Sequence, residues 1–173
     1  MFLLIAFAVL SIGASFLCSV LEAAILSLTP SYIAQVQETN EPLHKKLNAL
    51  KRDIDRPLAA ILTLNTVAHT VGAAGVGAQS AIVFGNAYLG ATSAVLTLLI
   101  LIFSEIIPKS LGAAYWQKLA PPFGMMIWWL TILLTPAVII FEQLTRFVSR
   151  GADGQPTFTR DEMQAMAQIG AEE

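Results

Sequence analysis

Hydrophobic positions in this chain gather into long runs instead of alternating with polar ones. Residues 2–28, 57–84 and 89–111 are each predominantly apolar. A helix needs about 20 apolar residues to cross a bilayer, and each run is at least that long. The pattern therefore predicts three membrane-spanning helices. A β-barrel would need a regular alternation of apolar and polar residues, which is weak here.

Residues 31–56 have a different pattern. Apolar residues recur at helical spacing while basic residues occupy other faces, which is typical of an amphipathic segment at a membrane surface. The apolar positions are Val36, Leu43, Leu47, Leu50 and Ile54, and the basic ones are Lys45, Lys46, Lys51, Arg52 and Arg56. Because cytoplasmic loops carry an excess of Lys and Arg, we expect this segment in the cytoplasm and the N-terminus outside.

A fourth apolar stretch, residues 119–141, has two interpretations. Its length allows a crossing, but prolines interrupt a straight helix, and basic residues on both sides favour cytoplasmic ends. These basic residues are Lys109, Lys118, Arg146 and Arg150. The pattern favours a helical hairpin over residues 114–149 that dips into the inner leaflet and returns, with a full fourth crossing as the alternative.

Together these patterns predict an all-α, polytopic membrane protein with three transmembrane helices and a cytoplasmic-side juxtamembrane helical hairpin. The transmembrane domain would cover residues 1–150. Residues 151–173 would form a polar linker and the start of a cytosolic helix, whose first turn carries a capping box at Thr159 and Glu162. We expect the chain to continue into a longer protein with a cytoplasmic C-terminus.

Composition supports this class and excludes several functions. Of the residues, 55% are hydrophobic and 13% are charged, whereas a soluble domain carries about 25% charged residues. The net charge of −2 and the lack of a dense basic cluster argue against a nucleic-acid partner. A single cysteine, Cys18, excludes an intrachain disulfide and most thiolate metal sites.

No catalytic constellation is present in the sequence, so we expect no enzyme. It has no Ser/His/Asp arrangement in a loop, no phosphate-cradling glycine loop and no zinc motif. An intramembrane protease would be the enzymatic alternative, but the membrane carboxylates here are glutamates without the motif that such enzymes carry.

Candidate chemistry concentrates where the third run ends. A carboxylate near the end of an apolar run is costly, which makes Glu105 a candidate functional residue. Pro108 has no N–H and displaces the carbonyl of Ser104, four residues earlier. Lys109, one turn after Glu105, can partly compensate its charge. The segment therefore offers hydroxyl, carbonyl and carboxylate oxygens, which suggests a cation site.

The first run adds a polar face. Ser11, Ser15 and Ser19 recur every four residues and so share one side of a helix, which Glu22 extends. For Ser11 and Ser15, helix–helix packing is an equal alternative to function, because small residues let backbones approach. For Ser19, beside Glu22, the pattern favours function.

The second run contributes Asn65 and His69, which share a helix face. Asn65 offers a neutral amide oxygen, whereas His69 is expected to be a hydrogen-bonded packing residue. The candidate metal ligands are thus Ser19, Glu22, Asn65, Ser104 and Glu105. Oxygen-only sites suit Mg²⁺, Ca²⁺ or Na⁺ and disfavour zinc or copper. Two carboxylates would neutralise one divalent ion, although the same residues would also suit a proton relay.

Two segments match known signatures. Residues 19–27 are SVLEAAILS and residues 104–109 are SEIIPK. They resemble the S-x-x-E-x-A-x-x-S and E-x-x-P-K signatures of the CorB/CorC magnesium transport family, related to the eukaryotic CNNM (cyclin-M) proteins. Asn65 matches the asparagine of that family's second span, and the resemblance covers nearly the whole chain.

The resemblance implies a homodimer in the cell membrane that carries Mg²⁺ outward, coupled to Na⁺. Ser19, Asn65 and Glu105 would hold the ion, with Glu22 and Ser104 close by. The longer protein would continue into nucleotide-sensing CBS domains. Two alternatives stay open: a membrane anchor that positions a cytosolic sensor without carrying ions, and a proton- or sodium-coupled carrier of Co²⁺ or Ca²⁺.

Overall fold

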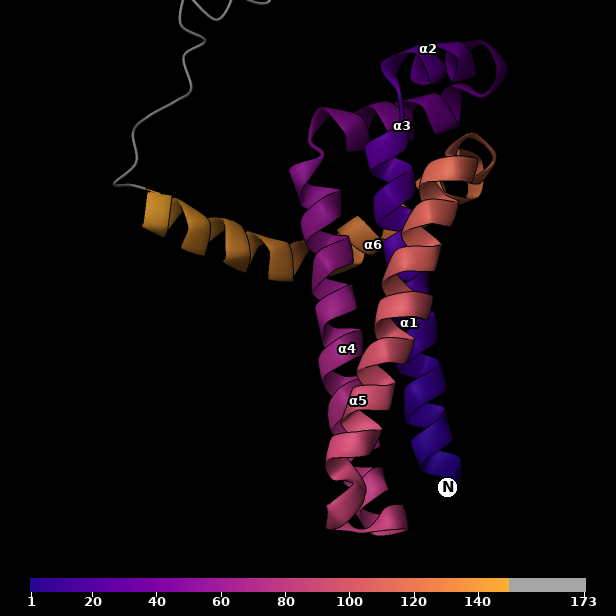
Figure 1. Cartoon of the computed structure of the whole chain (residues 1–173). Helices are drawn as coiled ribbons and strands as arrows, with labels where there is room; N and C mark the ends of the chain where they lie inside the picture. The colour runs from indigo at the N-terminus through magenta and orange to yellow at the C-terminus, as the bar shows by residue number, and fades with distance from the viewer. Residues whose placement is uncertain (150–173) are drawn as a thin grey trace, which may run out of the picture. The chain divides into compact units, whose positions relative to one another are not determined.

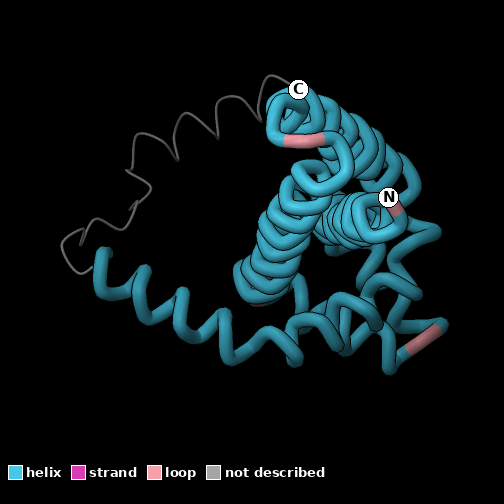
Figure 2. Tube along the Cα trace, turned by 90° about the horizontal axis from the view of Figure 1, so that it is seen from below, coloured by secondary structure: helices cyan, strands magenta, loops and turns pink. Residues whose placement is uncertain are grey.

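The computed structural model describes the backbone of residues 1–149 and the side chains of residues 1–140. Figure 1 and Figure 2 show helix through nearly all of this part, joined by short loops. The elements are α1 (Phe2–Ser27), α2 (Pro30–Thr39), α3 (Glu41–Arg52), α4 (Asp55–Phe84), η1 (Asn86–Tyr88), α5 (Leu89–Leu99), η2 (Ile100–Ile106) and α6 (Ile107–Ser149). The chain divides into a compact unit, Met1–Val138, and a second unit from Ile139 onward. The predicted linker and helix at 151–173 lie outside the described residues.

Three helical stretches are long and apolar enough to cross a membrane: α1, α4 and the run Asn86–Ile140. This confirms the all-α class and the three spans. The predicted runs 2–28 and 57–84 correspond to α1 and α4, and the run 89–111 corresponds to α5, η2 and the start of α6. Helix α1 packs against α4 and η2, and α4 packs against α5, so the three lie side by side in Figure 1.

Much of the outer surface of these helices is apolar. Large exposed hydrophobic residues include Phe2, Val9, Ile82, Val95 and Leu98. A monomeric soluble protein rarely exposes apolar patches of this extent, whereas acyl chains of a bilayer solvate them. The turn at the far end of α4 and α5 is made by Gly85, whose φ of +86° favours glycine.

The amphipathic segment predicted at 31–56 consists of α2 and α3. Thr29 caps α2 by accepting a hydrogen bond from the N–H of Tyr32 at 3.3 Å, and Asn40 caps α3 by accepting one from the N–H of Leu43 at 3.1 Å. The apolar faces of both helices are buried, in a cluster of Leu28, Ile33, Val36, Leu43, Leu47 and Ala120. A second cluster joins α1, α3, α4 and α6 through Cys18, Leu21, Ile25, Leu50, Ile61 and Ile127. The predicted helical, one-sided apolar pattern is therefore confirmed, whereas the place of this segment at the membrane surface stays a prediction.

Helix α6 bends near its beginning. Tyr115 has non-helical angles (φ −111°, ψ 16°), whereas Pro121, Pro122 and Pro136 lie inside helix. The hydroxyl of Tyr32 in α2 donates to the carbonyl of Gln117 at 3.1 Å, just after the bend. The chain thus turns at Tyr115, at the start of the predicted hairpin, and not at its prolines. The membrane placement of residues 114–149 stays a prediction.

Candidate cation site

The predicted serine face of α1 is buried against α4. Ser11, Ser15 and Ser19 are all inaccessible or nearly so. The hydroxyl of Ser11 donates to a backbone carbonyl of α4 at 2.8 Å, and the hydroxyl of Ser15 lies 2.5 Å from Nε2 of His69. A Cβ on Gly72 would overlap the Ser11 side chain, so glycine permits this close approach. Ser11 therefore serves helix packing, and His69 is the hydrogen-bonded packing residue that the sequence predicted.

The third helix changes its winding just before Pro108. Residues Ile100–Ile106 form a π-helix, and the N–H of Ile107 donates to the carbonyl of Ile102, five residues earlier. Pro108 has no N–H, so the carbonyl of Ser104 lacks the donor that an α-helix would supply. A π-helical turn holds an extra residue, which rotates the side chains around it, and such turns are frequent at functional sites. The sequence predicted a disturbed backbone here, but not the π-helix.

Two carboxylates and one ammonium group meet beside this π-helix. Nζ of Lys109 lies 3.1 Å from Oε2 of Glu105 and 3.4 Å from Oε2 of Glu22. The other oxygen of Glu105, Oε1, accepts a hydrogen bond from Nδ2 of Asn65 at 3.2 Å and lies 3.9 Å from Nε2 of His69. These contacts join α1, α4, η2 and α6. The Glu105–Lys109 pair was predicted from spacing, whereas the Glu22–Lys109 pair was not.

Two polar atoms on α1 and α4 are buried without a hydrogen-bond partner among the described side chains: Oγ of Ser19 and Oδ1 of Asn65. The orientation of the Asn65 amide follows from its neighbour. An ionised carboxylate only accepts hydrogen bonds, so the amide nitrogen faces Oε1 of Glu105 and the amide oxygen Oδ1 is left for a different partner. An unpaired buried polar group costs about 1–3 kcal/mol. A cation ligated by these oxygens would offset that cost.

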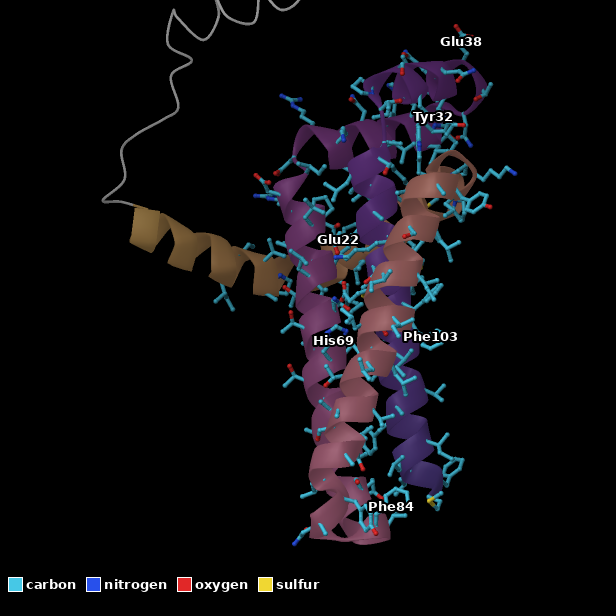
Figure 3. All side chains as sticks on the ribbon, viewed as in Figure 1. Glu22, Tyr32, Glu38, His69, Phe84 and Phe103 are labelled. Atoms are coloured by element: carbon cyan, nitrogen blue, oxygen red, sulfur yellow. The ribbon has the colours of Figure 1, made fainter. Side chains whose placement is uncertain are left out.

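The structure brings three of the five predicted ligands together. Glu22, Asn65 and Glu105 are linked by the contacts above, and Ser19 precedes Glu22 by one turn on the face of α1 that packs against α4. The hydroxyl of Ser104 is engaged elsewhere, because it donates to the carbonyl of Ile12 in α1 at 3.3 Å. In Figure 3, Glu22 lies nearer than His69 to the end of the bundle that carries α2 and α3.

The donor set is rich in oxygen and poor in nitrogen and sulfur. Within residues 1–140 no three His, Cys, Asp or Glu side chains group as a metal site would require, so neutral hydroxyl and amide oxygens would have to complete any ligand shell. The side chains of Glu22 and Glu105 are only 17% and 25% exposed. With Lys109 between them, the two carboxylates and the ammonium group together carry one net negative charge, which attracts cations.

The chain is similar to known membrane proteins over most of its length. The profile of the "Cyclin M transmembrane N-terminal domain" (CNNM) matches residues 5–173. UPF0053 protein sll1254 from Synechocystis is 33% identical over 157 residues, which cover 91% of this chain and 45% of that protein. The DUF21 domain-containing protein At1g55930, chloroplastic, from Arabidopsis thaliana is 31% identical over 93% of this chain and 25% of its own length. UPF0053 inner membrane protein YfjD from Escherichia coli is 26% identical over 75% of this chain and 30% of that protein. The chain thus spans less than half the length of these relatives.

Proposed function

The chain belongs to the cyclin M (CNNM) family of membrane proteins, and from that premise we propose that it is the membrane domain of a Mg²⁺ transporter. Ser19, Asn65 and Glu105 hold the ion, with Glu22 and Ser104 close by. The observation that carries the proposal is the pair of buried, unpartnered oxygens on Ser19 and Asn65, beside two carboxylates in otherwise apolar helices. Ionisable and polar groups are retained at such a depth when they serve an ion pathway.

Mg²⁺ fits this donor set better than Co²⁺ does. It prefers oxygen ligands and keeps several of its waters, so a site with few protein ligands suffices. Co²⁺ favours nitrogen ligands more strongly, and the imidazole of His69 is already hydrogen-bonded to Ser15. Na⁺ also takes oxygen ligands, which supports the second part of the proposal: Mg²⁺ leaves the cell in exchange for Na⁺ entering through the same oxygens.

The proposed orientation places α2 and α3 in the cytoplasm. The four basic residues of α3, with Arg56 at the start of α4, satisfy the positive-inside rule at that end, and the N-terminus of α1 then lies outside. We assign the protein to the cell membrane, as the name of the Escherichia coli relative states for that protein. A homodimer and CBS domains after the membrane domain complete the proposal.

The ion pairs of Lys109 favour one second candidate, a membrane anchor that carries no ion. In that case Lys109 would neutralise the carboxylates permanently, and the cluster would only hold α1, η2 and α6 together. The anchor does not explain why Oγ of Ser19 and Oδ1 of Asn65 are left unpaired. This is why the transporter is the preferred function.

Mg²⁺ flux into liposomes that contain the purified chain tests the two candidates. Glu105→Gln keeps the shape of the side chain and removes its charge, so we expect flux to fall at least about tenfold. The matched control is Glu41→Gln in α3, whose carboxylate pairs with Lys45 on the surface and contributes little. Flux that is unchanged by Glu105→Gln, or absent from the unmodified chain, would reject the transporter.

A further inference from the structure

Lys109 is the one cation among the described side chains that contacts both membrane carboxylates. Its ammonium group lies 3.4 Å from Oε2 of Glu22 and 3.1 Å from Oε2 of Glu105. It therefore occupies the position between two carboxylates where a bound metal ion would be most strongly attracted. The family comparison and the sequence patterns assign no such role to this residue.

The charges in the cluster change with the ion that binds. Glu22 and Glu105 together carry two negative charges, and Lys109 carries one positive charge. If Mg²⁺ joined them with Lys109 in place, the cluster would hold one excess positive charge in an apolar setting. If Lys109 moved away as Mg²⁺ arrived, the cluster would be neutral. Uncompensated charge is costly in a low-dielectric environment, so the second arrangement is favoured.

We propose that Lys109 is a tethered counter-ion, which occupies the Glu22–Glu105 pair when no Mg²⁺ is bound and withdraws toward water when Mg²⁺ enters. The inference rests on the proposed function, and it specifies how the same site releases a divalent ion. As Mg²⁺ leaves, the returning ammonium compensates carboxylates that would otherwise retain the ion. Lys109 is a positioning residue, because it does not itself touch the transported ion.

The side chain of Lys109 is suited to this movement. It is 44% exposed, although both of its partners are mostly buried. A lysine has a flexible four-carbon stem, so its ammonium group can reach water while the stem stays against apolar surface. Glu105 would keep its hydrogen bond from Asn65 during the exchange. The carboxylate therefore stays in position when the lysine leaves.

A lysine that only holds the two helices together makes the opposite prediction. If Lys109 merely organised the carboxylates, its removal would disorder the site and weaken Mg²⁺ binding. If Lys109 competes with Mg²⁺, its removal leaves two unpaired carboxylates, and Mg²⁺ binds more tightly while its release slows. The direction of the change in affinity thus separates the two roles.

The first measurement is residue-specific labelling of lysines by an amine-reactive reagent, read by mass spectrometry, on the unmodified protein in lipid. We expect Mg²⁺ to raise the labelling rate of Lys109 severalfold and to leave exposed Lys118, further along α6, unchanged. Labelling of Lys109 that stays constant or falls at saturating Mg²⁺ would overturn the inference. This labelling experiment uses only the unmodified protein, so its result does not depend on whether a variant folds.

The second measurement is Mg²⁺ affinity by calorimetry for Lys109→Met, Lys109→Arg and the control Lys118→Met. We expect Lys109→Met to bind Mg²⁺ about tenfold more tightly and to transport it more slowly, because an uncompensated carboxylate pair attracts a divalent ion strongly. Lys109→Arg should bind it more weakly than the unmodified protein, because guanidinium holds carboxylates with two parallel hydrogen bonds. Weaker binding by Lys109→Met overturns the inference while the transporter survives. If neither the unmodified protein nor any of these variants binds Mg²⁺, both the inference and the proposed transporter function are overturned.

Discussion

Gly112 provides a quantitative test of how closely α6 must approach α1. A Cβ at Gly112 would lie 2.6 Å from the carbonyl oxygen of Val20, 2.8 Å from Cβ of Ala23 and 3.3 Å from Cα of Val20. Ordinary contact begins at 3.4 Å, so the first distance is about 0.8 Å too short. Because the obstructing atoms are mostly backbone, they cannot rotate away as a side chain would. We therefore expect Gly112→Ala to push the two helices apart.

The magnitude follows from two opposing effects. Overpacking a tight contact lowers the free energy of unfolding by about 1–3 kcal/mol. Replacing glycine by alanine inside a helix raises it by about 1 kcal/mol. We expect a net loss of about 0–2 kcal/mol in the free energy of unfolding, with a melting temperature lower by about 2–4 °C for each kcal/mol. Gly112 lies three residues after Lys109, so the same displacement should lengthen the 3.4 Å contact between Lys109 and Glu22 and change Mg²⁺ affinity.

The assay is thermal unfolding in detergent, followed by the fluorescence of the three tryptophans, together with Mg²⁺ calorimetry. The control is Gly77→Ala in α4, where a Cβ meets no atom within 4 Å, so stability should stay the same or rise by up to about 1 kcal/mol. If Gly112→Ala melts like Gly77→Ala and binds Mg²⁺ like the unmodified chain, the close packing of α6 on α1 is not needed for the site.

Three further substitutions have definite expected outcomes. Ser80→Ala removes the 2.8 Å hydrogen bond from buried Ser80 to Thr92, which should cost about 1 kcal/mol in thermal unfolding; a loss no larger than that of exposed Ser93→Ala would contradict this. Asn40→Ala removes the cap of α3 and should also cost about 1 kcal/mol, so an unchanged melting temperature would count against the cap. Asn65→Leu removes an amide oxygen from the proposed ligands, and calorimetry should show Mg²⁺ affinity reduced at least about tenfold; unchanged affinity would exclude Asn65 as a ligand.

The helices and their ends could largely be predicted from local patterns. Length and hydropathy identify the spans, since nothing but continuous helix satisfies the backbone of so apolar a run in a bilayer. Thr29 and Asn40 act as caps because their short polar side chains reach free N–H groups at helix starts. The burial of the apolar face of α2 and α3 follows from its helical spacing. Each of these features is decided by residues close together in the chain.

Features that depend on distant residues were not predicted. The π-helix has a visible local cause in Pro108, but the proline also permits a simple kink, so the local pattern does not predict which of the two forms. The bend at Tyr115 is accompanied by the hydrogen bond from Tyr32 to the carbonyl of Gln117, residues that are 85 positions apart in the chain. The Glu22–Lys109 pair joins the first and third spans, so neither spacing nor periodicity reveals it. The local pattern predicts Ser104 as a ligand because it does not show where the hydroxyl donates. Its acceptor, the carbonyl of Ile12, lies on another helix.

The most direct test of the cation site is an experimental structure of the protein in lipid with Mg²⁺ bound. We expect density for an ion, with some of its waters, among Oγ of Ser19, Oδ1 of Asn65 and the carboxylate of Glu105. We also expect Nζ of Lys109 to lie beyond salt-bridge distance of Glu22. Lys109 still lying across both carboxylates at saturating Mg²⁺, with no ion among those oxygens, would contradict both expectations.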